Sequence, residues 1–396
     1  MKFWNNIEQA FKRSGLGIFE KWLDRGVVSP NLLNLYAIRR ILVIRQHDQL
    51  GDFLLATPVL RALRQFFSQA HIAVLARSYT AEVVYNNEYV NDVIVFPEKG
   101  YLWTPAKLWR LVAGLRRGWD LTIVLNTVSH SLTSDMLAHF SGARYILGSE
   151  HRIFSGCRRN FFYNLVARYF NQPKHQTERN LDIVRHLGID TDDRGEVMTL
   201  TAQDKLLARN FLRQYGVDDN EVIVAIHPGA GKLQNRWPVE KFAELATALH
   251  RQFAVRLIVT WGPKEKELGL DLRRRLPFEP IVVHGLSLRQ LAALLSHTDV
   301  FVCNDTGVMH LAAAVSTPLV AIFGPTDPNE WKPLGKKFIA LRGEKQRCEN
   351  VGVQQVLQTI QSLLGAKLPP RREPPDEALS PSANDLIDED TQNFLR

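Results

Sequence analysis

Short apolar runs alternate with helix-like stretches along this chain, and that alternation predicts an α/β fold with parallel sheets. The series occurs twice, so we expect two Rossmann-like, doubly wound lobes facing a cleft. A length of 396 residues fits two domains, and 45% hydrophobic with 23% charged residues is typical of a globular chain. Because such lobes bind ligands at the carboxyl ends of their strands, the function is expected in the loops that follow strands.

The individual elements follow from the spacing of apolar residues. In the first lobe the predicted strands are 41–44, 71–75, 93–96 and 121–125, and the predicted helices are 53–67 and 106–117. In the second lobe the strands are 222–226, 255–259, 281–283, 300–303 and 319–323, and the helices are 239–252, 288–297 and 311–315. Ser287 and Gln290 form a capping box at the start of helix 288–297, which supports this phasing. A polar, helix-rich stretch joins the two halves.

Two terminal segments differ in composition from the lobes, which we place at 39–200 and 201–368. Residues 369–396 are acidic and rich in proline, which is typical of a disordered tail. Residues 1–38 place tryptophans and other apolar residues at helical spacing with basic residues between them, as in a basic amphipathic segment. Such a segment either lies on an anionic membrane face or packs on the body of the protein, and the sequence leaves both alternatives open.

The charge is unevenly distributed. The whole chain carries a formal +8, but seven acidic and three basic residues from Pro369 onward give the tail −4 and leave +12 on residues 1–368. A body this basic favours an anionic partner, such as phosphate groups or a lipid surface. Its basic residues are dispersed and form no recognised nucleic-acid-binding motif, so no nucleic acid is expected as a partner.

The three cysteines, Cys157, Cys303 and Cys348, are far apart, which argues against a disulfide framework or a cysteine-rich zinc site. Their number fits a reducing compartment. The sequence has no uninterrupted apolar run of membrane-spanning length and no apolar core of a secretory signal near its start. We therefore expect a cytoplasmic protein, peripheral on the inner face of the cytoplasmic membrane if the basic body binds lipid.

The first strand leads into a polar loop that runs from Arg45 to Asp52. Gly51 permits a tight turn there, and Asp52 is expected at the start of the next helix. An aspartate in that position is a favourable helix cap. It could equally act as a general base on an acceptor hydroxyl, and the sequence does not choose between the two.

The strand that ends at residue 226 is followed by the sequence from His227 to Pro238. Gly229 and Gly231 expose backbone N–H groups, and Lys232 and Arg236 supply positive charge, a combination suited to a phosphate. The loop is neither a Walker motif nor a dinucleotide-binding fingerprint, and an ordinary glycine-containing turn would have the same composition.

Two further loops follow strands of the second lobe. Glu265 lies where it could accept hydrogen bonds from ribose hydroxyls, although an acidic residue in a first helical turn needs no ligand. Asp305, Thr306 and Gly307 precede a helix whose N-terminus favours a pyrophosphate. His310, one turn later, either faces the same ligand or is a buried core histidine.

Together these motifs resemble glycosyltransferase family 9, the ADP-heptose:lipopolysaccharide heptosyltransferases. The resemblance spans about residues 40–362, and the motifs occur in the family's order. The matching segments are 41–45, Leu50-Gly51-Asp52, Thr57-Pro58, 227–231, Arg236-Trp237-Pro238, 287–291, 304–307 with His310, and 323–328.

The resemblance implies a GT-B fold, with an N-terminal lobe for the acceptor and a C-terminal lobe for the nucleotide-sugar. It implies that Asp52 is the catalytic base and that Asp305, Thr306 and Gly307 contact phosphate and sugar. Glu265 is similar to the family's ribose-binding acid, with Glu267 as the alternative alignment. Neither a cofactor nor a protein-bound metal is implied.

One position departs from the family pattern, because Asn235 stands where the family often has a lysine two residues before the Trp-Pro pair. Lys232 or Arg236 would then stabilise the leaving diphosphate, unless the donor itself differs. On the acceptor side we expect contacts from Arg45 and Gly51, together with loops over about 129–173 that are rich in arginine and aromatic residues.

The sequence therefore predicts an inverting glycosyltransferase that moves a sugar, heptose from ADP-heptose, onto a lipopolysaccharide-core or related glycolipid acceptor. Two alternatives stay open at this point. A nucleotide-sugar epimerase of similar fold would convert the donor without an acceptor. A non-catalytic nucleotide-sugar-binding protein would bind the donor without turnover.

Overall fold

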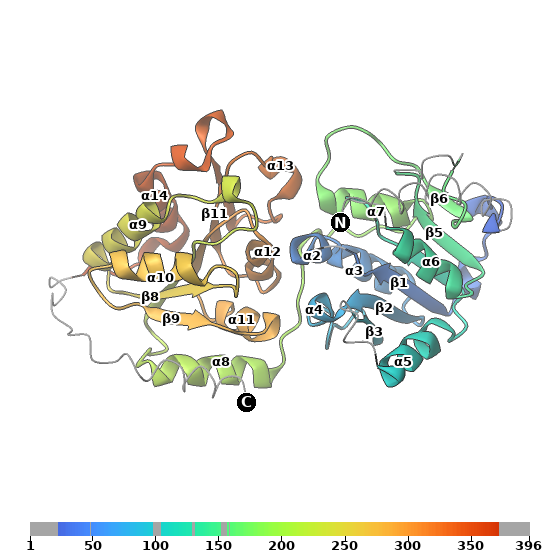
Figure 1. Ribbon diagram of the computed structural model, residues 1–396, viewed down its shortest axis with the longest axis horizontal. Helices are drawn as coiled ribbons and strands as arrows, with labels where there is room; N and C mark the ends of the chain where they lie inside the picture. Colours follow the sequence, from blue (N-terminus) through green and yellow to red (C-terminus); the bar gives the residue numbers. More distant parts are fainter. Residues whose placement is uncertain are drawn as a thin grey trace, which may run out of the picture. The chain divides into compact units, whose positions relative to one another are not determined.

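The computed structural model describes residues 23–371 apart from 48, 98–103, 129–130, 152–156 and 158. The described residues form two compact units that divide between Arg194 and Gly195 (Figure 1). Residues 1–22 and 372–396, which hold most of the predicted N-terminal extension and nearly all of the acidic tail, lie outside the described residues. No helix in the described part of the chain is long and apolar enough to cross a membrane.

The first unit is built on a six-stranded sheet in which every neighbouring pair is parallel. Its strands are β1 (Arg40–Arg45), β2 (His71–Arg77), β3 (Asp92–Phe96), β4 (Leu121–Val124), β5 (Tyr145–Ser149) and β6 (Leu165–Ala167). The order β3-β2-β1-β4-β5-β6 is that of the doubly wound Rossmann fold. The strand order reverses between β1 and β4, so a ligand is expected where those two strands end.

The helices of the first unit correct one prediction. They are α2 (Leu50–Leu54), α3 (Thr57–Phe66), α4 (Ser78–Ala81), α5 (Pro105–Leu115), α6 (Leu132–Phe140) and α7 (Gln176–Arg185). The single helix predicted over 53–67 is wrong, because α2 ends at Leu54 and α3 begins at Thr57. Pro58 has no N–H, so it cannot donate a helical hydrogen bond to the carbonyl of Leu54. The hydroxyl of Thr57 donates to that carbonyl instead, at 2.7 Å.

The stretch over 129–173, which was predicted to be loops, also differs. Its described part contains α6 and the strands β5 and β6. The side chains of Phe161, Phe162 and Tyr163, between these strands, are buried in the core. The aromatic character of these three residues therefore serves packing, whereas Phe140 and Phe170 of the same stretch are exposed.

The second unit repeats the topology of the first. Its strands are β7 (Val222–His227), β8 (Val255–Trp261), β9 (Ile281–His284), β10 (Val300–Asn304), β11 (Leu319–Phe323) and β12 (Phe338–Arg342), all paired in parallel. The order β12-β11-β10-β7-β8-β9 is the same doubly wound order read from the other edge, and it reverses between β7 and β10.

Seven α-helices are described in the second unit. They are α8 (Ala202–Gln214), α9 (Val239–Gln252), α10 (Lys266–Arg275), α11 (Leu288–Leu295), α12 (Gly307–Ala314), α13 (Pro328–Trp331) and α14 (Val353–Leu364). Single 3₁₀ turns lie at Pro30–Leu32 and Leu35–Ala37 in the first unit. In the second unit they lie at Leu233–Asn235, Glu344–Gln346, Cys348–Asn350 and Gly365–Lys367. The helix predicted over 239–252 is confirmed to the residue, and α12 begins at Gly307, where the sequence predicted a helix N-terminus.

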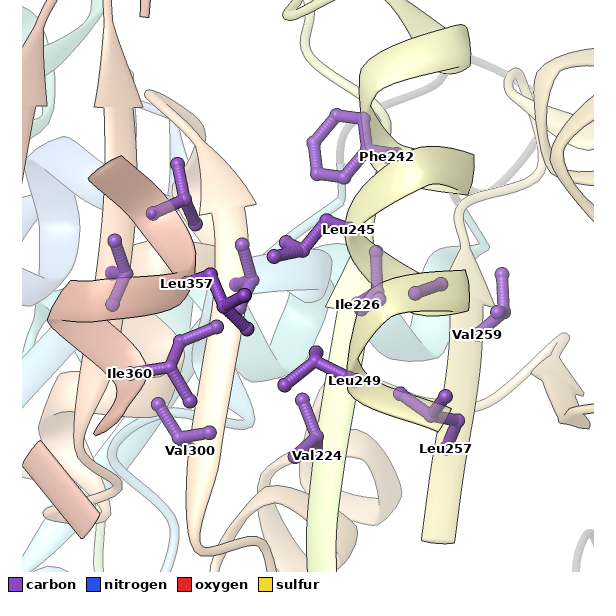
Figure 2. Packing of buried hydrophobic residues seen from close by; sticks show 14 of the residues in the cluster. Val224, Ile226, Phe242, Leu245, Leu249, Leu257, Val259, Val300, Leu357 and Ile360 are labelled. Carbon is purple, nitrogen blue, oxygen red and sulfur yellow. The ribbon is translucent and has the colours of Figure 1, made fainter. Parts of the chain in front are cut away.

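The core of the second unit shows why α9 forms where it does. Phe242, Leu245 and Leu249 recur at helical spacing and are fully buried. Figure 2 shows Leu249 beside Val224 on β7 and Leu245 pointing toward the neighbouring helix α14, and all three side chains belong to one buried cluster. Each such burial contributes about 1.5–3 kcal/mol, so the sheet is held rigidly beneath the loops that follow its strands.

The segment at the division between the units is anchored on both sides. Before the division, the carbonyl of Asp193 accepts from Nη1 of Arg61 on α3 (2.9 Å), and Nε of Arg194 lies 2.6 Å from Oε1 of Glu178 on α7. After it, Glu196 bonds to His310 in α12 (2.8 Å), and the Met198 N–H donates to the carbonyl of Ala314 (3.1 Å). Each anchor lies within its own unit.

Candidate active site

Asp52 lies in the first unit at the third position of α2, directly after β1. Its Oδ2 accepts from the backbone N–H of Gln49 at 3.4 Å, so the carboxylate does cap the helix, as one of the two alternatives for this residue predicted. The side chain is half-buried, which leaves part of it accessible to a ligand. Gly51 is the preceding residue of the same helix and is also half-buried.

Arg45 is buried at the end of β1 rather than presented to solvent. Its Nη2 donates to the carbonyl of Asp52 at 2.8 Å, and its Nη1 donates to the carbonyl of Leu125 and to Oδ1 of Asn180 (2.8 Å). Asn180, on α7, also donates to the carbonyl of Leu55 at 3.1 Å. These bonds fix α2 against β4 and α7. These bonds engage the guanidinium of Arg45 in positioning α2. They do not support the predicted direct contact between Arg45 and the acceptor.

Sequence reasoning missed Asn180. It lies 135 residues from Arg45 in the chain, in the middle of an ordinary helix. No local motif marks it. The only signal was a buried arginine at a strand end, which needs carbonyl or amide oxygens to accept its N–H groups.

In the second unit, Glu265 is the acid that reaches the glycine loop after β7. Its Oε2 accepts from the N–H of Gly262 (3.0 Å) and lies 3.3 Å from Nε2 of the buried His227. A Cβ placed on Gly229 would lie 2.1 Å from the Glu265 carboxyl carbon, so only glycine allows this approach. Glu267 is exposed in the first turn of α10. Of the two alternative acids, Glu265 is the one in contact with the loop.

The electrostatics of this contact keep Glu265 ionised. Burial alone would raise the pKa of Glu265, but the hydrogen bond and charge of His227, the Gly262 N–H and the charge of Arg236 together lower it. A carboxylate fixed in this way is an acceptor-only group at neutral pH. Its remaining lone pairs suit the hydroxyls of a sugar.

Asn304 fastens the same loop from the last position of β10. Its Nδ2 donates to the carbonyls of Pro228 (2.8 Å) and Gly229 (3.2 Å), and its Oδ1 accepts from the N–H of Trp237 at 2.9 Å. The side chain is fully buried, so all of these bonds are internal. Asn304 lies inside a motif that was identified in the sequence, but no role was predicted for it. In the structure its side chain joins the loops after β7 and β10 by hydrogen bonds.

Asp305, Thr306 and Gly307 lie where the sequence predicted, at the start of α12. Oδ2 of Asp305 accepts from Nδ2 of Asn235 at 2.8 Å, and the same Nδ2 lies 3.3 Å from the Thr326 hydroxyl. Thr306 is the N-cap residue, and its hydroxyl makes no capping bond. The first N–H groups of α12 and its dipole therefore present a site suited to an anion.

Asn235, the departure from the family pattern, is buried beside Asp305. It brings an amide where a lysine would bring a charge. Arg236 is half-buried and its Nε donates to the carbonyl of Ala230 at 2.9 Å, while Lys232 is exposed in the same loop. Two cations thus flank the loop, but neither is bonded to Asp305 in the described contacts.

His310 is buried in α12 and its Nδ1 lies 2.8 Å from Oε1 of the buried Glu196. Burial raises the pKa of Glu196, and His310 opposes that rise. Of the two alternatives for His310, the core histidine is the one these contacts support. Among the described residues, no His, Cys, Asp or Glu side chains gather in a group of three or more that could hold a metal ion.

Comparison with known proteins decides the family. The profile of glycosyltransferase family 9 (heptosyltransferase) matches residues 108–361, which is more than half of the chain. The chain is a member of glycosyltransferase family 9. Its predicted enzyme class, a glycosyltransferase, is thereby confirmed. The epimerase and the non-catalytic alternatives are not supported.

Two similar relatives of this family 9 protein are lipopolysaccharide heptosyltransferases 3 from Escherichia coli. One is 27% identical over 296 residues, covering 73% of this chain and 85% of the relative. The other, from strain K12, is 29% identical over 299 residues, covering 73% of this chain and 84% of the relative.

Solved structures confirm the GT-B type of fold. A glycosyl transferase family 9 protein from Veillonella parvula superposes with a TM-score of 0.73 at 23% identity, over 82% of this chain and 97% of that one. The E. coli ADP-heptose lps heptosyltransferase II superposes with a TM-score of 0.68 at 23% identity, over 82% and 98%.

Proposed function

We propose that this family 9 protein transfers heptose from ADP-heptose to a lipopolysaccharide-core or related glycolipid acceptor, with inversion at the anomeric carbon. The observation that carries the proposal is the match to lipopolysaccharide heptosyltransferases 3, which extends over 85% of the length of one of them. The anion-binding start of α12 and the ribose-suited carboxylate of Glu265 support it independently, because both fit a nucleoside diphosphate sugar.

Asp52 acts as the general base in this proposal. Its carboxylate takes the proton from the acceptor hydroxyl as that oxygen attacks the anomeric carbon of the donor. The new glycosidic bond forms as the bond to the diphosphate breaks, and the attack on the opposite face inverts the configuration. Arg45 supports the step by holding the backbone of Asp52 at 2.8 Å.

The second unit stabilises the leaving diphosphate. Its negative charge is matched by the N–H groups at Thr306 and Gly307, by the dipole of α12 and by the cations Lys232 and Arg236. The glycines at 229 and 231 let the backbone approach the phosphates, and His227 and Asp305 hold the loops that form the site. Glu265 receives the ribose hydroxyls.

The acceptor side also predicts where the enzyme works. A glycolipid acceptor is carried by a membrane, and the +12 body of the chain suits an anionic lipid surface. The protein is therefore proposed to be cytoplasmic and peripheral on the inner face of the cytoplasmic membrane. Association should weaken as salt is raised, and membrane binding that is unchanged by high salt would refute this part.

The test is release of nucleoside diphosphate from ADP-heptose, with UDP- and GDP-sugars in parallel, in the presence and absence of extracted lipopolysaccharide core. We expect release that needs the acceptor, prefers ADP-heptose and collapses in Asp52→Asn. Preference for another donor would keep the transferase and replace the sugar. Absence of acceptor-dependent release with every donor would refute the proposed function.

A further inference from the structure

Helix α5 has an apolar face that the described part of the chain leaves exposed. Leu108, Trp109 and Val112 are 47%, 70% and 49% exposed, and their spacing places them side by side on the helix. The neighbouring face of the helix, with Leu111 and Leu115, is buried against the sheet. Figure 1 shows α5 beside β3, the edge strand of the first unit's sheet.

Positive charge surrounds these apolar side chains. Lys107, Arg110 and Arg116 are exposed on the same helix or at its end, and no ion pair joins any of the three to a carboxylate in the part of the chain that the structure describes. From residue 99 to residue 117 the sequence has five basic residues and no acidic one. We call Leu108, Trp109 and Val112 with Lys107, Arg110 and Arg116 the α5 surface.

Another helix shows that this combination is not general. On α8, Leu206 and Leu207 are 50% and 41% exposed. The arginines of that helix, however, are paired, because Arg209 and Arg213 share the carboxylate of Asp219 within 3.5 Å. Exposed leucines alone are common on proteins. An exposed tryptophan within a cluster of unpaired basic residues fits a partner that is both apolar and anionic.

We propose that the α5 surface docks the enzyme on an anionic lipid bilayer. A tryptophan and two aliphatic side chains enter the boundary between headgroups and acyl chains, where an indole with one apolar and one polar edge is favoured. The flexible cations beside them reach the lipid phosphates. The inference rests on the proposed function, since a membrane-borne acceptor is what gives docking its purpose.

Flotation with vesicles tests the proposal on the full chain. Vesicles of phosphatidylethanolamine and phosphatidylglycerol (3:1) are compared with pure phosphatidylcholine at low salt. We expect binding to the anionic vesicles, and a loss of about tenfold or more in both Lys107→Glu/Arg110→Glu and Trp109→Ser/Val112→Ser. Leu206→Ser/Leu207→Ser on α8 is the matched control and should bind like wild type.

A fluorescent label places the contact even if another segment also binds lipid. Cys303 and Cys348 are buried, so a Cys157→Ser background leaves a single introduced cysteine open to labelling. An environment-sensitive dye at Val112→Cys should shift to the blue with anionic vesicles but not with phosphatidylcholine. The same dye at Leu206→Cys should not shift with either.

The outcomes separate this proposal from the proposed function. Turnover of a soluble, detergent-dispersed acceptor should be unchanged in the α5 variants, and its absence in wild type would count against the proposed function alone. Vesicle binding that survives both α5 variants, or no shift at Val112→Cys on bound protein, would overturn the docking proposal. So would a wild-type dimer that the Trp109→Ser/Val112→Ser variant dissociates, because the surface would then join two copies.

Discussion

After β1 the first unit presents a carboxylate, Asp52, on a five-residue helix, whereas after β7 and β10 the second unit presents glycines and the start of α12. Both places are the point where the same strand order reverses. One therefore suits removal of a proton, and the other suits an anion. The comparison teaches that topology fixes where a ligand site lies, while a few residues at the strand ends fix its charge.

The two sites are also held differently. In the first unit a buried arginine, Arg45, reaches out to three carbonyl or amide oxygens. In the second unit a neutral amide, Asn304, fastens the loops. Asn304 fixes the two loops without adding charge, so the positive potential at the second site comes from Lys232, Arg236 and the start of α12.

The largest effect is expected at Asp52. The Asp52→Asn variant keeps an oxygen that can accept from the Gln49 N–H, so α2 should remain, but the amide cannot take a proton. We expect turnover to fall roughly a hundred- to ten-thousand-fold, with donor affinity unchanged. Acceptor-dependent release of nucleoside diphosphate measures turnover, and calorimetric titration with ADP measures donor affinity. An equal loss of ADP affinity would contradict the division of labour between the units.

A smaller loss is expected at Arg45. A lysine in Arg45→Lys cannot bond Leu125, Asn180 and the Asp52 carbonyl at once, so α2 should shift. We expect kcat to fall about tenfold or more, with KM for the donor unchanged. Arg64→Lys is the control, since Arg64 also donates to backbone carbonyls, including Ala70 at 2.8 Å, but away from α2. Equal effects of the two substitutions would show that general stability, rather than the position of Asp52, is responsible.

Gly229→Ala addresses the second unit. The added Cβ would lie 2.1 Å from the Glu265 carboxyl carbon and would push that side chain off the loop. Losing such a polar contact costs about 1–3 kcal/mol, so donor affinity should fall about tenfold or more. Gly352→Ala, at the start of α14 and outside the donor loops, is the matched control, because nothing lies within 4 Å of its Cβ position. Calorimetric titration with ADP should show the loss in the first variant and not in the second.

The smallest effect concerns pH and stability. Because the pKa of Glu265 is lowered in the folded protein, its contribution to stability is present at neutral pH and is lost as pH falls through the folded pKa. Glu265→Gln should therefore lower the urea midpoint at pH 7, and the gap to wild type should narrow toward pH 4. A gap that stays constant would show that the carboxylate's charge plays no part.

Much of the fold could be predicted because apolar runs mark buried parallel strands. The strand over 319–323 and the helix over 239–252 were predicted to the residue. β6 was not predicted because a strand of three residues is too short to show an apolar pattern. β12 was not predicted because every position of that edge strand is only half-buried. The break before Thr57 depended on a missing N–H at Pro58, which apolar spacing does not register.

The loops that carry the site could be predicted from the sequence, but the hydrogen bonds that hold them could not. Asp52, Gly229, Glu265 and Asp305 all lie after strands of the sheets, as their sequence positions indicated. The Pro228 and Gly229 carbonyls that accept from Asn304 lie 76 and 75 residues away in the chain, and no local pattern records them. A charged residue at a strand end was read as ligand-facing for Arg45, yet burial and hydrogen bonding decide its role, and only the structure supplies these.

The anchors around the division between the units tie each side of it to its own unit. Arg194 is bonded to Glu178 on α7 of the first unit, and Glu196 to His310 on α12 of the second. Because α12 begins at Gly307, the bond to His310 links the start of the second unit to the helix whose N-terminus forms the anion site. Glu196 and the anion site therefore belong to one rigid piece of the second unit.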